Sequence, residues 1–309
     1  MPKLRKTIFL TGAFGFLLAG LCLGQFRGGG GRGFGSGESG PIIYTEGNIP
    51  VNEDTVQTAR ETVSHSTGTP NWTNAPGFEK DAFTFARIIY RSDRTFGGGR
   101  RSWWGWLNDY PDSDLNLSWR LQQMTSMKVD PDGRVLRLTD AVLADYPFIY
   151  MVKPGRLDFR EEEIPFLRKY LLNGGMLMAD DFWGTQEWAT FESQIKRVFP
   201  QRHWVELPMD HPIFHCVFNL NMPKNKLQVP SIHLFERTGS TSRNGEDSID
   251  VHVRAWLDDR QRIMILATHN TDNGDGWERE GESGEYFHLF SERVAYPLGI
   301  NIIFYAMTH

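Results

Sequence analysis

Alternating apolar and polar stretches divide the chain between residues 80 and 309 into short strands and helices. Residues 148–152 (FIYMV) and 176–179 (MLMA) are continuous apolar runs, as expected of strands that are covered on both faces. Between them, residues 159–172 begin with acidic side chains, carry apolar residues at helical spacing and end at a Gly-Gly pair. This order predicts a strand, an amphipathic helix and a second strand.

The same pattern continues on both sides of this unit. It predicts further strands at 83–90, 135–138 and 263–267 and helices at 115–127, 188–198 and 293–307. Alternating strands and helices are typical of a mostly parallel sheet with helices on both faces. Such α/β folds place their sites just beyond the carboxyl ends of the strands. The residues expected there are 91–93, 153–156, 180–183 and 269–275.

The first 24 residues have the three-part pattern of a secretory signal peptide. Three basic residues precede an uncharged stretch from Ile8 to Leu23, and small residues follow before Gln25. That stretch of about 16 residues is shorter than the ~20 that a membrane-spanning helix usually needs. We therefore predict that residues 1–24 are cleaved during export to the periplasm or the extracellular space. A retained membrane anchor and lipidation at Cys22 stay open as alternatives.

Residues 25–79 are expected to form a glycine-rich linker and a polar lead-in, with the folded domain covering 80–309. Residues 27–40 are dominated by glycine and have little to bury, which is typical of a flexible tether. The lead-in contains one candidate helix at 51–64. We expect it to lie over the surface of the domain.

Charge and cysteine content exclude two classes of function and fold. The formal net charge is −5, and removal of residues 1–24 with their three basic side chains makes it −8. A chain with this charge is not expected to bind nucleic acid. Cleavage also leaves Cys216 as the one cysteine. The fold therefore depends on its hydrophobic core and not on a disulfide.

Several runs along the domain resemble, in the right order, the domain of unknown function family numbered 4159. They are FTFARIIY, WWGWLNDYPDSDLNL, YLLNGGMLMADDFW, MDHPIF and the closing YPLGINIIFYAMTH. The resemblance covers about Phe83 to His309. It implies a flavodoxin-like sheet related to the class I glutamine amidotransferase-like superfamily. That superfamily includes enzymes and members without amidotransferase chemistry, and the family itself brings no established activity.

The amidotransferase resemblance can be tested against the cysteines. Such enzymes need a thiolate on a tight turn after a central strand and a histidine that activates it. The strand at 176–179 ends in Asp180-Asp181, with no cysteine beside it. Cys216 lies close to His211 and His215 but lacks the flanking glycines, and we interpret it as a small buried hydrophobic residue. Glutamine hydrolysis is therefore not expected.

The adjacent carboxylates Asp180 and Asp181 are candidate catalytic or metal-binding residues. Two carboxylates at one strand end repel each other unless a cation, an arginine or hydrogen-bond donors lie nearby. One interpretation is a metal or polar-ligand site, with Asp210 and His211 or the turn at 109–114 as partners. The other is structural: one aspartate caps the following helix and its neighbour pairs with an arginine. Both interpretations stay open.

A loop before the first long helix combines glycines, arginines, tryptophans and acidic residues. Its candidate ligand-binding residues are Arg101, Trp103, Trp104, Trp106 and Asp109. Tryptophan and arginine side chains stack on sugar rings or on a protein partner. The alternative is that the tryptophans pack this loop onto the domain.

Residues 271–282 resemble an EF-hand loop in part. Asn273, Asp275 and Glu282 match later ligand positions, but a threonine occupies the first position, where aspartate is expected. A divalent cation, calcium in particular, would take these residues or the Asp180–Asp181 pair as ligands. The default interpretation is a solvated turn without an ion.

These features predict first a noncatalytic binding or assembly module outside the cytoplasm, with a protein or carbohydrate partner. The alternative is a carboxylate- or metal-dependent hydrolase that acts on an extracytoplasmic carbohydrate. Asp180 or Asp181 would then be the base or a metal ligand, and His211 the acid or a ligand. Membrane contact is expected only through the N-terminal segment, if it is not cleaved.

Overall fold

The computed structural model describes residues 42–66, 68–77, 81–92 and 105–309. The signal segment, the glycine-rich linker and the candidate residues Arg101, Trp103 and Trp104 lie outside them. The described residues belong to one compact unit, Ser39–His309. Within this part of the chain, no helix is both long enough and apolar enough to cross a bilayer.

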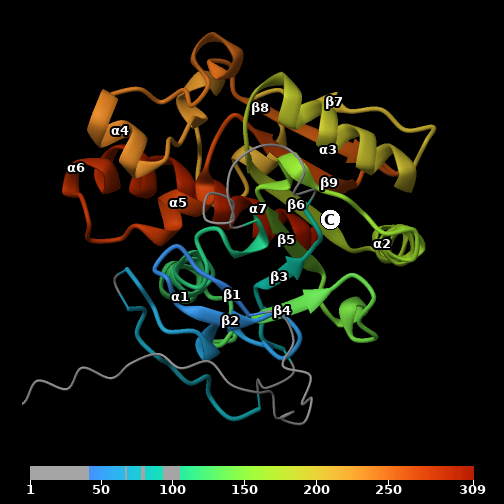
Figure 1. The fold of residues 1–309 in the computed structure, drawn as a ribbon, viewed down its shortest axis with the longest axis horizontal. Coiled ribbons are helices and arrows are strands. Elements are labelled where there is room, and N and C mark those ends of the chain that lie inside the picture. The colour runs from blue at the N-terminus through green and yellow to red at the C-terminus, as the bar shows by residue number, and fades with distance from the viewer. Residues whose placement is uncertain (1–41, 67, 78–80, 93–104) are drawn as a thin grey trace, which may run out of the picture. The chain divides into compact units, whose positions relative to one another are not determined.

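A seven-stranded sheet forms the centre of the domain (Figure 1). In spatial order its strands are β4 (Arg134–Arg137), β3 (Ala86–Ile89), β5 (Phe148–Val152), β6 (Met176–Phe182), β9 (Ile263–His269), β8 (His252–Leu257) and β7 (Val205–Glu206). The strands from β4 to β9 pair in parallel, whereas β8 and β7 are antiparallel. The prediction of a mostly parallel α/β sheet is confirmed.

Helices cover both faces of this sheet (Figure 1). One face packs against α2 (Glu163–Leu172) and α3 (Gly184–Val198), and the other against α1 (Asp112–Met124), α5 (Asn273–Glu278) and α7 (Tyr296–Thr308). Cover on both faces of the sheet explains why the whole sequence of β5 is apolar. Ile149 and Met151 join the core under α2 and α3, whereas Phe148, Tyr150 and Val152 join the opposite core. Successive strand side chains point to opposite faces, so a doubly covered strand needs both sets to be apolar.

The smaller elements lie before the sheet and in the connections. They are β1 (Ile42–Tyr44), β2 (Pro50–Asn52), α4 (Ile232–Thr238), α6 (Gly284–Tyr286) and a π-helix at Phe287–Ala295. The closing helix predicted at 293–307 is therefore two elements, because the π-helix leads directly into α7. Apolar spacing does not distinguish the wider π-turn from an α-turn.

The helix predicted at 51–64 is wrong. The segment forms β2 and a short 3₁₀ turn at Ala59–Glu61. Its backbone hydrogen-bonds with the domain instead of with itself: the Ala59 N–H donates to the Asp132 carbonyl over 2.9 Å, and the Gln57 carbonyl accepts from the Val135 N–H over 2.8 Å. These bonds hold the lead-in along β4, so tertiary contacts override local helix propensity.

Candidate functional site

Unusual backbone conformations gather at the carboxyl edge of the parallel strands. Asp109, Lys153, Asp181 and Asn270 have φ values of 61°, 56°, 54° and 63°. Non-glycine residues seldom adopt this left-handed conformation, which costs on the order of 1 kcal/mol or more per residue. Such backbones persist where surrounding contacts enforce them, and they gather at functional sites. This edge is therefore the candidate site.

Asp180 is held by a full set of hydrogen-bond donors. Its carboxylate accepts from Thr268 Oγ1 at 2.5 Å, Asn273 Nδ2 at 2.8 Å, the Gly274 N–H at 3.0 Å and Tyr150 Oη at 3.2 Å. Burial raises the pKa of this carboxyl to about 6, although the donated hydrogen bonds act in the opposite direction. Asp180 thus fastens the loop after β9 to the end of β6.

Asp181 lies within a β-bulge of β6, where its register with β9 shifts, and it has charged neighbours. Its oxygens lie 3.1 Å from Lys153 Nζ and 3.5 Å from Arg243 Nη1, and they accept from Trp183 Nε1 and Asn108 Nδ2. The arginine pairing expected for one aspartate of this pair is therefore present. The expected helix cap is not: Asn270 Oδ1 and Asp247 Oδ2 accept from the first N–H groups of α3 instead.

Asp109 is the least compensated carboxylate at this edge. Asn108 Nδ2 donates to its Oδ1 over 2.7 Å, whereas its buried Oδ2 has no hydrogen-bond partner. Oδ2 lies so close to Gly274 that a Cβ at that position would collide with it. Burial, followed by the charges of Asp181 and Asp275, raises the pKa of Asp109 well above its usual range.

Four further carboxylates surround Asp109. Oxygens of Asp109, Asp181 and Asp272 lie within 4.8 Å of one another, and so do oxygens of Asp109, Asp275 and Glu278. We call these five buried residues the acidic cluster. Burial is the main cause that raises the pKa of Asp272 and Glu278, and it raises the pKa of Asp275 to about 6. Three oxygen ligands that converge in this way are suited to a hard divalent cation.

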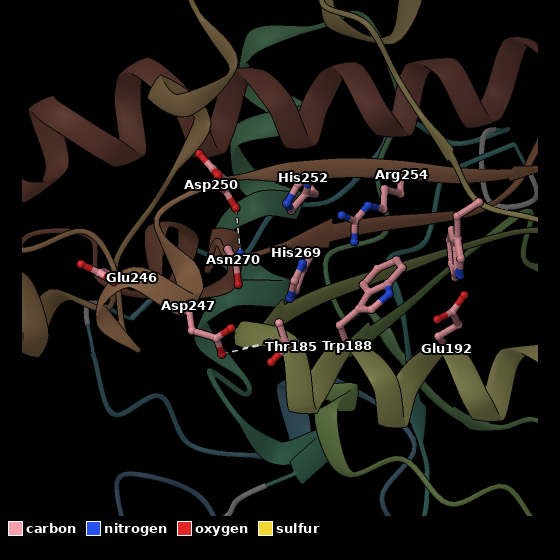
Figure 2. Close-up of a pocket in the computed structure, with 11 residues that line it drawn as sticks. Thr185, Trp188, Glu192, Glu246, Asp247, Asp250, His252, Arg254, His269 and Asn270 are labelled. Carbon is pink, nitrogen blue, oxygen red and sulfur yellow. Dashed lines mark hydrogen bonds between the residues drawn. The ribbon is translucent and has the colours of Figure 1, made fainter.

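A pocket of about 410 Å³ opens next to the end of β9 (Figure 2). Its wall comes from the start of α3, from β8, from the end of β9 and from the loop before β8. The lining residues are Thr185, Trp188, Glu192, Trp204, Glu246, Asp247, Asp250, His252, Arg254, His269 and Asn270. Its volume is in the range of small-ligand pockets, and its wall is more polar than is usual for them.

His269 presents an unused hydrogen-bond acceptor in this wall. Its Nε2 lies 3.0 Å from the Gly184 carbonyl, which can only accept, so Nε2 carries the proton and Nδ1 has a free lone pair. Nδ1 is buried and has no hydrogen-bond partner. Burial lowers the pKa of His269 to about 4, so the ring is neutral at pH 7. Figure 2 shows this ring beside His252, Asn270 and Trp188.

Aromatic and charged side chains complete the pocket. Trp188 lies 5.2 Å from the Trp204 ring, and the Arg254 guanidinium stands 4.1 Å above Trp188. Trp204 Nε1 is buried without a hydrogen-bond partner. The pocket therefore combines aromatic side chains with the charge of Arg254 and the carboxylates of the loop before β8.

A model of the family described as a domain of unknown function, DUF4159, matches residues 84–307. The chain belongs to this family. No curated protein matches it. The matched part of the DUF4159 domain runs from just before β3 into α7, so it includes the acidic cluster and the pocket.

Within the DUF4159 domain, some of the sequence-predicted residues meet and others do not. Asn108 Nδ2 donates to both Asp109 and Asp181, which brings the turn after β3 to the end of β6. His211 lies elsewhere, with its ring against Tyr305 at 5.5 Å and its Nδ1 accepting from the Ile213 N–H. No contact of the described residues joins Asp210 or His211 to the Asp180–Asp181 pair.

Trp106 packs onto the domain, which is one of the two interpretations that the sequence left open. It is buried against Tyr110 with ring centroids 5.6 Å apart, and its Nε1 donates to Glu53 over 2.6 Å. Cys216 differs from its expected buried state. It is exposed, and its thiol donates to the Asn301 carbonyl.

The segment compared with an EF-hand loop is helical where an open turn was expected. Asn273 and Asp275 belong to α5, where Asn273 donates to Asp180 and Asp275 accepts from the Ile232 N–H and Tyr286 Oη. Glu282 pairs with Arg279 at 3.1 Å. The Asp272 side chain starts this helix by accepting from the Asp275 N–H, which explains why an Asn/Asp/Gly-rich sequence folds into a helical turn.

Sequence reasoning did not identify the pocket. His252 and Arg254 alternate with buried residues along β8, and this period of two was a usable strand signal. Trp188 and Trp204 had no such signal, because they come from two elements that approach each other only in the folded domain.

Proposed function

We propose that the domain is a noncatalytic binding module that holds a carbohydrate ligand in the pocket beside β9. The observation that carries this proposal is a pocket of about 410 Å³ whose wall combines Trp188 and Trp204 with several carboxylates, Asp250 among them.

Carbohydrate suits this pocket better than an apolar ligand. Sugar hydroxyls both donate and accept hydrogen bonds, and the wall is lined by carboxylate, histidine and arginine side chains that can pair with them. The wall also contains two tryptophans, Trp188 and Trp204, the type of side chain that packs against sugar rings. Carboxylates on the rim, among them Asp250 and Glu246, accept from further hydroxyls.

The wider setting that we propose is extracytoplasmic. The signal-like residues 1–24 support export, with the domain either released after cleavage or held by a retained or lipidated N-terminus. The parallel strands have the order β4-β3-β5-β6-β9, which is 2-1-3-4-5 in chain order and supports a flavodoxin-like relationship. In an amidotransferase-like ancestry, the strand-end turn at Asp180–Asp181 would have no nucleophilic cysteine, in keeping with a binding role.

A glycan array followed by titration calorimetry tests the binding role. The best soluble oligosaccharide from the array should lose at least about tenfold in affinity in Trp188→Ala, about 1.4 kcal/mol of binding free energy. Asp250→Ala, at an exposed side chain on the rim, should lose affinity without altering the fold. Phe166→Ala is the matched control, because this exposed aromatic lies on α2 outside the pocket wall. Array-wide absence of binding, or equal affinity in all variants, would contradict the proposal.

A carboxylate-dependent hydrolase is the second candidate, favoured by one observation. Asp181 has a left-handed backbone in a strand-to-helix turn, where some α/β hydrolases hold their nucleophile. If this candidate holds, an oligosaccharide that binds is also cleaved slowly, and Asp181→Asn removes cleavage while binding persists. Chromatography of the oligosaccharide after long incubation measures this. If the oligosaccharide stays intact after incubation with the unaltered protein, the hydrolase candidate is ruled out and the binding module remains the proposed function.

A further inference from the structure

The Asp109 carboxylate is buried and forms no ion pair with a basic side chain of the described residues. Only 1% of this residue is exposed, and its Oδ2 has no hydrogen-bond partner. Its one donor is the Asn108 amide, which is neutral. A buried carboxylate in such surroundings costs several kcal/mol unless it is neutralised.

The cations around the acidic cluster serve other members. Lys153 and Arg243 pair with Asp181, and Arg279 pairs with Glu278 at 2.7 Å. His65 Nε2 also lies 2.6 Å from Glu278. Within the described part of the chain, neither Asp109 nor Asp272 has a basic side chain within ion-pair distance. Neither aspartate therefore has an ion pair of its own, although the charge of Lys153 acts at longer range to lower the pKa of both.

Two further details suit a cation that prefers oxygen ligands and binds beside Asp109. The Asn273 side chain is completely buried, and its Oδ1 lacks a partner although its Nδ2 donates to Asp180. Gly274 follows, and the absence of a Cβ lets the chain approach Asp109 Oδ2 closely. Free oxygen atoms therefore come from the turn after β3 and from the start of α5, two segments far apart in sequence.

We propose that one divalent cation of the oxygen-preferring class binds between Asp109 and Asp272, with Asp181 as the third carboxylate. Oxygens of these three residues lie within 4.8 Å of one another, close enough to share one ion. Asp181 keeps its ion pair with Lys153 on Oδ2. The ion joins the turn after β3, the end of β6 and the loop after β9, and it acts independently of the sugar pocket.

Arg243 provides an internal competitor for this ion. Its side chain is 40% exposed and reaches Asp181 Oδ1 from the surface. Its positive charge near the site lowers cation affinity by Coulomb repulsion. Removal of this charge should therefore strengthen cation binding, whereas removal of a ligand charge should weaken it.

The test uses the full chain, stripped with a chelator and titrated separately with Ca²⁺, Mg²⁺ and Mn²⁺ in a calorimeter. We expect one ion per chain for at least one metal, a higher Tm when it is bound, and elemental analysis that agrees with this stoichiometry. Asp272→Asn should weaken binding at least tenfold, although its Oδ1 can still cap α5. Arg243→Gln should tighten binding several-fold.

A matched control and a second ligand variant keep the test decisive. Asp259→Asn removes an exposed carboxylate outside the cluster and should leave affinity unchanged. If Asp272→Asn does not fold, Asp109→Asn replaces it with the same expected loss. Failure of every metal to bind the unaltered chain overturns the proposal and leaves protons as the neutralising partner. Equal affinity of the unaltered chain and the ligand variant also overturns it, because that result would mean that the ion binds to surface carboxylates.

Discussion

Arg87 lies completely buried in β3 and organises the turn that carries Asp109. Its guanidinium pairs with Asp114 at 2.5 Å and donates to the carbonyls of Trp106 and Asn108. Because all these bonds lie out of contact with water, they depend on one another. The guanidinium is a charge in the middle of an apolar strand, and these acceptors offset the free energy of removing it from water.

Substitution of Arg87 should therefore destabilise the fold strongly. Arg87→Leu would leave the buried Asp114 carboxylate without its cation, with Ser113 Oγ as its remaining side-chain donor, and would remove the donor to two buried carbonyls. We expect a loss of about 3–5 kcal/mol in the free energy of unfolding. Arg91→Leu is the control, because its pair with Asp158 is exposed and worth about 0–1 kcal/mol. Urea unfolding measures both, and a similar small effect in the two variants would refute the structural role of Arg87.

His269 makes stability depend on pH. Its folded pKa of about 4 is below the ordinary 6.5, so the unfolded chain binds the proton more strongly. Stability from this group is complete above pH 6.5 and falls as the pH decreases toward 4, by about 3 kcal/mol. Asp180 and Asp275 act with the opposite sign, because their pKa values are raised to about 6 and their contribution grows as the pH falls.

A difference experiment separates these contributions. His269→Gln should lose less stability than the unaltered chain between pH 6.5 and 4, because it cannot take up the proton. The carboxyl contributions are common to both proteins and cancel in the comparison. Parallel pH dependences in the two proteins, measured by chemical unfolding, would contradict a neutral buried His269.

At the scale of elements, α5 is positioned by its close approach to the turn after β3. Gly274 has no side chain at the point where Asp109 Oδ2 meets the helix. Gly274→Ala should cost about 1–3 kcal/mol in unfolding free energy, since neither the helix nor the buried carboxylate has space to move away. Gly284→Ala in α6 meets no atom within 4 Å and serves as the control. A neutral or stabilising Gly274→Ala, measured by thermal unfolding, would refute this packing.

Elements also differ in how well their limits follow from sequence. Residues 148–152 coincide with β5, since both faces are covered and every side chain is apolar. Strand β6 extends past its apolar run to Phe182, because Asp180 pairs in register with Val152 and Phe182 pairs with His269 beyond the bulge. Hydrogen bonds from neighbouring segments stabilise the two aspartates there, and no local pattern encodes those donors.

For the whole molecule, the lead-in is an integral part of the domain. Arg60 donates to the carbonyls of Pro131, Thr69 and Pro70, and His65 lies between the buried carboxylates Asp112 and Glu278. The boundary expected at residue 80 therefore excludes residues that contact and cover the core.

Truncation distinguishes the two boundaries. A chain that begins at residue 42 should unfold like the full chain, whereas one that begins at residue 80 should lose more than about 3 kcal/mol, because the buried Asp112 and Glu278 lose their contacts with His65. Circular dichroism during heating measures both. Equal midpoints for the two truncated chains would show that the lead-in contributes nothing to stability.

The sequence by itself determined the mostly parallel sheet and the position of most strands and helices, because periodic burial is a local property of each element. It also located Asp180 and Asp181 at a strand end. Only the tertiary structure decided that Asp109 and Asp272 meet Asp181, and that His269 lines a pocket with Trp188 and Trp204. These groups come from separate loops, and their convergence depends on strand order and register, which are set by contacts across the whole chain.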